Sequence, residues 1–437
     1  MTVDVIGAGL AGVEAANTLA QFGYDVILHE MKPIKHSAAH KSNDFAELVC
    51  SNSLKNERLS TAAGLLKAEA RLLGSLVIET ALRCRVDAGG ALAVNRENFS
   101  KIITDEIRKN KRVTVVPEEV KYIDTSRPII IATGPLTDGD FAKSLAEIAG
   151  GFLSFYDAAA PIVTFDSLCK DRVFAQNRYE YDSVGDYLNA YFDKESFERF
   201  YSELVNAKTA KLHDADDFSV YEGCMPIEKL AKRGTETIRF GPMKPVGLKD
   251  PRTAARPYAA VQLRKEDKEG RLYNIVGFQT NLTFSEQQRV FRMIPGLEQV
   301  EFARYGVMHR NSFVDSPKVL RKTLNLKEHG NIYIAGQLNG MEGYIESAVG
   351  GILAAQFMYR MLQNKEPVVP SKYTMCGALL EYITTENKDF QPMGANMGIL
   401  PAPENRIKDK KERYLSLSKR ALAALEKYID AAEIGGR

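Results

Sequence analysis

Two cysteines stand in sequence settings that suit thiol chemistry. Cys50 lies in the polar run ELVCSNSL, whereas a structural cysteine usually packs among aliphatic side chains. Cys224 lies in YEGCMPIEKLAKRG, just before Pro226 and a predicted helix over 227–232. Free backbone donors at a helix start, together with nearby lysines and arginines, stabilise a thiolate. Both thiols are therefore candidate nucleophiles or bases, and the alternative for Cys224 is a buried cysteine in a turn.

The other three cysteines give no such signal. We expect packing roles alone for Cys84, Cys169 and Cys376, because no Cys-x-x-Cys pair occurs in the sequence. The six histidines are scattered, and no Cys/His group has the spacing of zinc ligands. The sequence therefore predicts no metal site, and unpaired thiols of this kind are typical of the cytoplasm.

The elements that would position such groups begin at the N-terminus. Residues 3–6 predict a buried strand and residues 10–22 a helix, joined by the pattern G-x-G-x-x-G. The pattern consists of Gly7, Ala8, Gly9, Leu10, Ala11 and Gly12. Its glycines permit a tight turn, close approach of a pyrophosphate, and close packing of helix on strand. A second predicted strand over 24–28 leads to Glu30, placed to accept from a ribose hydroxyl, so the unit predicts dinucleotide binding.

Two later segments decide between FAD and a nicotinamide as the tightly held cofactor. RPIIIATGPL predicts a strand that ends near Gly134, a pattern that recurs in flavoproteins. NIYIAGQLNGMEGYIESAVGGILAA predicts a strand, a glycine-rich turn with Glu342, Gly343 and Tyr344, and a helix. The start of such a helix can face a flavin ring and stabilise negative charge on it. The alternative is a further strand–helix unit of a parallel sheet, but together the segments favour FAD.

These elements predict an α/β fold: an FAD-binding Rossmann-like domain of the glutathione-reductase type with an inserted α+β domain. Residues 1–151 and 325–437 would form the discontinuous FAD-binding domain. Residues 152–324 would form an inserted substrate or RNA domain that carries Cys224. Within it, TIRFGPMKPVGL, YAAVQLRKED and RLYNIVGFQT predict strands. The late segment RIKDKKERYLSLSKRALAALEKY predicts a terminal helix, with an RNA contact as the alternative.

Composition limits the classes of partner. Lys and Arg number 58 and Asp and Glu 56, so the net charge of +2 excludes a uniformly polybasic nucleic-acid-binding protein but not a local basic patch. No apolar run reaches the roughly 18 residues that cross a bilayer. The N-terminus has no basic region of the kind that begins a signal peptide. We therefore expect no membrane partner and a cytoplasmic location.

Several strings spread over almost the whole chain carry a family resemblance. They include VIGAGLAGVEAA, HEMKP, FAELVCSNSL, AGGALAVNRENFS, YDAAAPIV, GCMPIEKLAKRG, RFGPMKPVGL, YGVMHRN and EGYIESAVGG. In these stretches the chain resembles the folate- and FAD-dependent tRNA (uracil-5-)-methyltransferases of bacteria, the TrmFO family. One departure is QPMGANMGILP, which lacks the tryptophan expected before its second glycine. This departure concerns a local contact rather than the family.

The resemblance implies a reaction that uses both thiols. Adding a thiolate to C6 of a uracil makes its C5 nucleophilic. In this family C5 then receives a methylene carbon from methylenetetrahydrofolate, with FAD as cofactor and NADH or NADPH as reductant. The two catalytic cysteines of the family match Cys224 and Cys50. We expect Cys224 to be the C6 nucleophile and Cys50 the base at C5, with the reverse assignment as the alternative. Tyr344 would stack on folate or flavin, or simply pack.

The substrate that the resemblance implies is tRNA. The expected target is uridine 54 in the T-loop of the T-arm, which would become 5-methyluridine. One alternative is the same chemistry on a uridine of ribosomal RNA. Others are a flavin oxidoreductase of small molecules and a flavoprotein that modifies nothing; the presence of both thiols speaks against the last.

Overall fold

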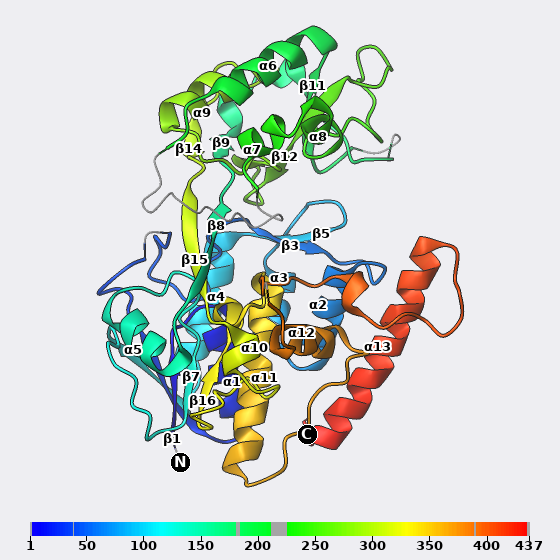
Figure 1. Cartoon of the computed structure of the whole chain (residues 1–437). Coiled ribbons are helices and arrows are strands. Elements are labelled where there is room, and N and C mark those ends of the chain that lie inside the picture. The colour runs from blue at the N-terminus through cyan, green and yellow to red at the C-terminus, as the bar shows by residue number, and fades with distance from the viewer. Residues whose placement is uncertain (1, 38, 181–183, 211–224, 389, 435–437) are drawn as a thin grey trace.

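A computed structural model describes residues 2–37, 39–180, 184–210, 225–388 and 390–434, and these form two parts of unequal size (Figure 1). The larger part contains a parallel sheet and both ends of the described chain. The smaller part, at the top of Figure 1, surrounds an antiparallel sheet formed by the middle of the chain. Two paired strands, β8 (Leu153–Ala158) and β15 (Met308–Phe313), run between the parts.

The parallel sheet has five strands in the order β16-β7-β1-β2-β6. Their bounds are β1 (Thr2–Ile6), β2 (Asp25–Glu30), β6 (Val113–Pro117), β7 (Ile129–Ile131) and β16 (Ile332–Ile334). β7 and β16 are buried along their whole length, as expected for strands covered on both faces. Because all five strands run in the same direction, the loops after their carboxyl ends meet at one edge.

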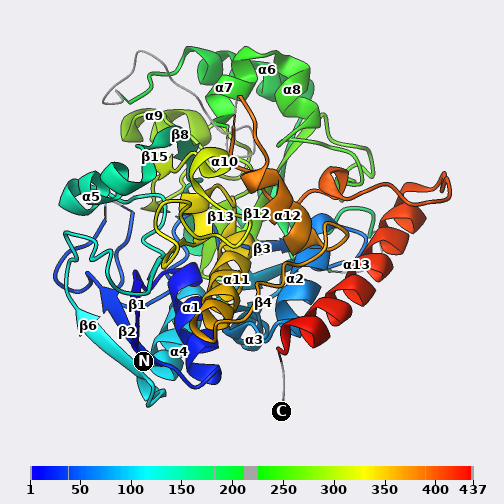
Figure 2. The ribbon, with the colours of Figure 1, turned by 60° about the horizontal axis from the view of Figure 1, so that its bottom comes forward.

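Helices cover the parallel sheet. On one face α1 (Leu10–Gln21) and α11 (Tyr344–Leu362) lie side by side (Figure 2), and α5 (Gly139–Ala149) packs on the other. The short helix α10 (Ser316–Val319) contacts α12 (Met375–Thr384). The remaining helices here are α2 (Ala62–Leu72), α3 (Leu76–Arg83), α4 (Arg96–Lys109) and α13 (Lys410–Ala432). A small antiparallel sheet has the order β3 (Ser53–Asn56), β5 (Ala91–Val94), β4 (Arg85–Val86). Among the described helices, none is long and apolar enough to cross a membrane.

The smaller part has its own sheet of six strands, in the order β10-β11-β12-β13-β9-β14. Its elements are β9 (Ile162–Thr164), β10 (Val173–Ala175), β11 (Leu188–Phe192), α6 (Lys194–Asn206), α7 (Ile227–Lys232), α8 (Thr235–Phe240), β12 (Ala259–Lys265), β13 (Leu272–Ile275), α9 (Phe284–Phe291) and β14 (Phe302–Arg304). A separate apolar core holds it together, with Phe192, Phe200 and Phe278 at its centre. Val314 and Leu320, which fall within the predicted inserted domain 152–324, pack beside the parallel sheet and not in this core. The division into domains stays a prediction.

Most of the expected elements occur, but one predicted strand is wrong. The predicted strands in YAAVQLRKED and RLYNIVGFQT occur as β12 and β13, and the late terminal helix as α13. TIRF instead lies in the short helix α8. A helical turn buries Ile238 alone and places the guanidinium carbon of Arg239 4.0 Å from the centre of the Tyr258 ring. Tertiary packing thus overrides the strand preference of threonine, isoleucine and phenylalanine.

Candidate active site

The glycine turn after β1 combines tight packing with open space. Gly7 has φ of +98°, and a Cβ there would lie 2.7 Å from the carbonyl oxygen of Ala132. A Cβ on Gly12 would lie 1.7 Å from the carbonyl oxygen of Gly7, so only glycine lets α1 pack this closely. Gly9 differs, because a Cβ there would meet no described atom within 4 Å. This glycine therefore leaves room for a ligand to approach the backbone.

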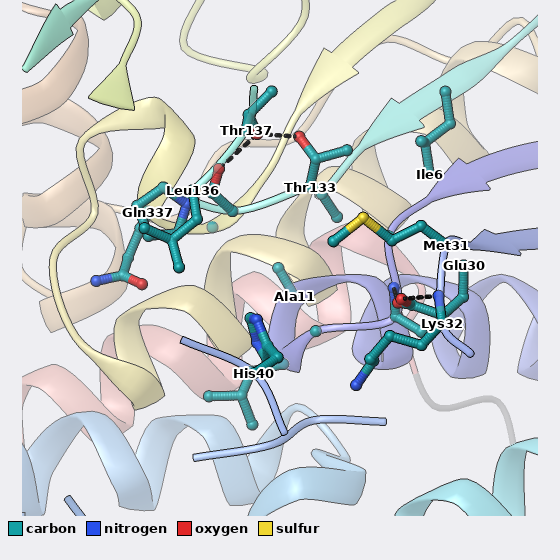
Figure 3. A pocket seen from close by; sticks show the side chains of 18 of the residues that line it. Ile6, Ala11, Glu30, Met31, Lys32, His40, Thr133, Leu136, Thr137 and Gln337 are labelled. Atoms are coloured by element: carbon teal, nitrogen blue, oxygen red, sulfur yellow. Dashed lines mark hydrogen bonds between the residues drawn. The ribbon is translucent and has the colours of Figure 1, made fainter. Parts of the chain in front are cut away.

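Gly9 opens into a cleft at the carboxyl edge of the parallel sheet (Figure 3). The cleft encloses about 1250 Å³, counting open solvent at its mouth. It is lined by the turn from Gly7 to Ala11, by residues 29–32, 118–120, 132–138 and 335–337, and by single residues including His40, Tyr344 and Ser347. These segments follow β1, β2, β6, β7 and β16, so the sheet brings together loops that are far apart in sequence. Such an edge is where open α/β sheets bind nucleotides.

Glu30 lies where the sequence predicted, at the end of β2 and in the lining of the cleft. Its carboxylate is buried and accepts hydrogen bonds from the backbone N–H of Ala8 at 2.8 Å and of Lys32 at 3.0 Å. Each carboxylate oxygen retains a lone pair beyond these bonds. Glu30 therefore braces the glycine turn and can still accept from a hydroxyl group. That second role stays a prediction.

The start of α1 faces the cleft. α1 begins at Leu10, directly after Gly9, and no side-chain hydrogen bond caps it among the described residues, whereas at the start of α11 the Glu346 carboxylate lies against Gly343. Unpaired N–H groups at a helix start favour a bound anion. Gly134 also lines the cleft, with φ of +76° and no described atom within 4 Å of a Cβ placed there. The cleft therefore suits a large phosphate-bearing ligand such as a dinucleotide.

Tyr344 links the cleft to Cys50. Its side-chain oxygen accepts hydrogen bonds from the backbone N–H of Cys50 at 2.8 Å and of Ser51 at 3.1 Å. Burial raises the pKa of the Tyr344 hydroxyl, which keeps it neutral. The tyrosine thus lines the cleft and fixes the thiol segment with one side chain, and ring stacking on a ligand stays a prediction.

Three arginines hold the rest of this segment, residues 48–52. Arg96 at the start of α4 donates to the carbonyl oxygen of Leu48 at 2.8 Å, and Arg304 on β14 donates to that of Val49 at 2.6 Å. Arg264 on β12 donates to Ser51 Oγ at 2.8 Å and to Asn52 Oδ1 at 3.0 Å. Two of these arginines belong to the smaller part, so the segment joins the two parts. No local pattern in the sequence connects these arginines with Cys50.

The Cys50 thiol, which belongs to segment 48–52, lies in a polar setting. Its Sγ is 3.4 Å from Oδ2 of Asp157 on β8, to which it can donate. Burial raises the pKa of Cys50 well above its usual value, and the negative charges of Asp157 and Glu342 raise it further. Burial also raises the pKa of Glu342 to about 8, and Gln337 donates to its Oε1 at 2.7 Å. The thiol is therefore protonated near neutral pH.

Cys224 lies outside the described residues, so its predicted role is not tested. The chain on either side of that gap is held against residues 279–283. Ala210 donates its N–H to the carbonyl oxygen of Asn281, and Ile227 donates to that of Gln279, both at 2.7 Å. The predicted helix after Pro226 occurs as α7, the element that follows Cys224 in the chain.

The remaining cysteines do not join this site. Cys84 and Cys376 are buried, and burial raises the pKa of both thiols, as expected for packing residues. Cys169 is exposed, so the packing role predicted for it is wrong. In the described ranges, no group of three or more His, Cys, Asp or Glu side chains could hold a metal ion.

Comparisons with known proteins agree with one another. The family model described as "Glucose inhibited division protein A" matches residues 2–366. A relative from Caldicellulosiruptor bescii named methylenetetrahydrofolate–tRNA-(uracil-5-)-methyltransferase TrmFO is 51% identical over 425 residues, which is 97% of each chain. Relatives of the same name from Acetivibrio thermocellus and Staphylococcus epidermidis are 51% and 50% identical over 429 residues, 98% of each chain.

A solved structure confirms the predicted fold class. Aquifex aeolicus GidA, in its form II crystal, aligns with the whole of this chain and 74% of its own, with a TM-score of 0.72 at 16% sequence identity. At that identity the likeness concerns the fold alone.

Proposed function

The chain belongs to the glucose-inhibited-division-protein-A family and to its TrmFO methyltransferases, and we propose that it methylates C5 of a uridine in tRNA with a carbon from methylenetetrahydrofolate. The observation that carries the proposal is the contact between cleft and thiol. Tyr344 lines the cleft and accepts hydrogen bonds from the backbone of Cys50, so a ligand in the cleft borders the thiol segment.

FAD is the proposed occupant of the cleft. Gly9 leaves room for a pyrophosphate, the start of α1 favours its charge, and Glu30 can accept from a ribose hydroxyl. When bound, FAD would supply the one-carbon and hydride chemistry of the reaction, with NADH or NADPH as the reductant. The chain's own residues would bind it and hold Cys50 beside it. Methylenetetrahydrofolate would bind beside it.

The two thiols have different proposed roles. Cys224 would add to C6 of the uracil, which makes C5 nucleophilic, and Cys50 would take the proton from C5. A base must be held within hydrogen-bond reach of its proton, and the anchored segment 48–52 supplies such a hold for Cys50. Residues 152–324 would form the inserted RNA domain and residues 1–151 and 325–437 the FAD-binding domain.

The proposed RNA target is uridine 54 in the T-loop of tRNA. A base in a folded loop must swing out before a thiol reaches its C6, which costs a few kcal/mol. RNA shape should therefore matter more than a long sequence, and a T-arm minihelix should suffice. The same chemistry on a ribosomal RNA uridine is the second candidate. Free thiols and an RNA substrate support a cytoplasmic site of action.

Mapping modified uridines in total tRNA and ribosomal RNA from cells with and without the gene tests this proposal. We expect 5-methyluridine to disappear from position 54 of tRNA and to return with the plasmid-borne gene. Unchanged tRNA with a methyl group lost from ribosomal RNA would replace the target with the second candidate. No loss of 5-methyluridine in either RNA would contradict the proposed function.

A further inference from the structure

Asp157 is the carboxylate placed at the sulfur of Cys50. It lies on β8, is 6% exposed, and its Oδ2 is 3.4 Å from Sγ of Cys50. The sequence offers no reason to single it out, because it is one acid in the string YDAAAPIV, more than a hundred positions from Cys50. The contact places a buried acceptor directly against the proposed base.

Several charged or titratable groups surround the sulfur of Cys50 together with Asp157. The charged or titratable groups around it are Asp157 on β8, Glu342 and Tyr344 at the start of α11, and Arg304 on β14. His309 lies directly opposite Asp157 in the ribbon of β8 and β15, and burial lowers the pKa of that imidazole. Opposed residues of an antiparallel pair present their side chains on the same face. Asp157 therefore sits in a polar group that spans both parts of the molecule.

A buried thiol cannot act as a base until it loses its proton. Burial and the negative charge of Asp157 both oppose ionisation of Cys50, so its thiolate forms only when the proton moves to a neighbouring acceptor, and transfer to Asp157 also removes that charge. Arg304 attracts a thiolate, but it holds the carbonyl oxygen of Val49 and cannot accept a proton. Asp157 can accept a proton, and its Oδ2 lies 3.4 Å from the sulfur of Cys50.

We propose that Asp157 is the positioning residue that orients the Cys50 thiol and takes its proton. The inference rests on the proposed function, in which Cys50 is the base at C5. In this step the S–H bond of Cys50 breaks and an O–H bond forms on Asp157, while the electron pair stays on sulfur. The thiolate can then accept the proton from C5 of the uridine. After release of the product, the proton on Asp157 passes to solvent and the pair is restored.

The test compares Asp157→Asn, Asp157→Glu and the matched control Asp250→Asn. Asp250 is also buried, but it pairs with Arg252 in the smaller part rather than with the thiol segment. Three quantities are measured for each: single-turnover methylation of a T-arm RNA, the pH profile of Cys50 alkylation by iodoacetamide resolved by peptide mass spectrometry, and adduct formation with 5-fluorouridine RNA.

Asp157→Asn should slow methylation by about 100-fold, the usual scale for loss of proton-transfer assistance. Alkylation of Cys50 should move to lower pH, because a negative charge beside the sulfur has been removed. The 5-fluorouridine adduct and bound FAD should persist, Asp157→Glu should recover part of the rate, and Asp250→Asn should match the wild type.

Methylation by Asp157→Asn within threefold of the wild type would overturn the inference. So would slow methylation with an unchanged alkylation profile, or joint loss of FAD and adduct, which would mark a structural role. The alkylation measurement needs no methyl donor. If the wild type transfers no folate carbon, the proposed function fails, and the alkylation profile still decides whether Asp157 controls the Cys50 thiol.

Discussion

Gly9 and Gly12 use the missing side chain in different ways, although they are three residues apart. The space beside Gly12 is filled by the backbone of Gly7, whereas the space beside Gly9 is open to the cleft. Gly12 is thus needed by the fold, and Gly9 is needed by a ligand. This difference allows the two needs to be separated by mutation.

Gly9→Val should leave the fold intact and remove bound FAD. The new side chain meets no described protein atom at its Cβ, but it occupies the approach of the pyrophosphate. We expect the ratio of flavin to protein absorbance to fall at least tenfold, which corresponds to about 1.4 kcal/mol of binding free energy.

The control for this variant is Gly330→Val, at an exposed loop glycine whose Cβ would meet an amide nitrogen at an ordinary 3.7 Å. It should retain FAD. If Gly9→Val keeps its flavin, or if the wild type is colourless and cannot be reconstituted with FAD, the assignment of the cleft is wrong.

The two thiols should be separable with 5-fluorouridine RNA, whose C5 fluorine cannot leave as a proton. Cys224→Ala should form no covalent adduct, since the proposed C6 nucleophile is gone. Cys50→Ala should still trap RNA through Cys224 but transfer no methyl group. A denaturing gel of each variant with methylenetetrahydrofolate under reducing conditions measures the adduct.

The exposed cysteine variant Cys169→Ala serves as control and should behave as the wild type. An adduct in Cys224→Ala with none in Cys50→Ala would mean that the roles are reversed. Full methylation by Cys50→Ala would show that this cysteine is structural.

At the scale of elements, segment 48–52 owes its position to α4, β12, β14 and the start of α11. Each contributes one side chain that bonds the segment, and the bonds reach both backbone and side-chain atoms. Loops are mobile unless such partners fix them. The described contacts convert a loop between β2 and β3 into a rigid support for a thiol.

Arg304→Gln should therefore slow methylation without releasing FAD. Loss of the charged donor to Val49 costs about 1 to 3 kcal/mol locally, and a displacement of about 1 Å at a reacting group lowers rates by up to about 100-fold. We expect single-turnover methylation by Arg304→Gln to fall 10- to 100-fold. The rate of Arg304→Lys should lie between those of Arg304→Gln and the wild type, because lysine keeps the charge but lacks the planar guanidinium.

Arg199→Gln is the matched control, since Arg199 is an exposed arginine in a loose pair with Glu195 at 3.8 Å. Its rate should equal that of the wild type. Equal rates for Arg304→Gln and Arg199→Gln would remove the proposed support of Cys50.

The elements themselves were largely predictable, because their signals are local. The strand, glycine turn, helix and second strand of residues 2–30 lie within one stretch, and each glycine has a mechanical reason. The contacts that define the thiol site were not predictable, since Arg304 on β14 bonds Val49 and Asp157 on β8 contacts Cys50 from more than a hundred residues away. No spacing rule in the sequence connects such positions. The helix α8 was missed because packing of Arg239 outweighed local preference.

At the scale of the whole molecule, the cleft lies at one edge of the parallel sheet, and the smaller part contacts the segment that carries Cys50 beside it. Arg264 on β12 and Arg304 on β14 bond segment 48–52, so the smaller part is joined to the larger part beside Cys50. A reaction between a cofactor, a folate and an RNA base needs one site that all three can reach. The proposal therefore places the chemistry where the two parts touch.

The most direct test of this account is the origin of the methyl carbon. Purified protein with FAD and NADPH is given T-arm RNA and methylenetetrahydrofolate labelled in its one-carbon unit, and the RNA nucleosides are analysed by mass spectrometry. A parallel reaction contains labelled S-adenosylmethionine and no folate. We predict label in 5-methyluridine from the folate alone. Label from S-adenosylmethionine, or none from the folate in a protein that retains its flavin, would contradict the account.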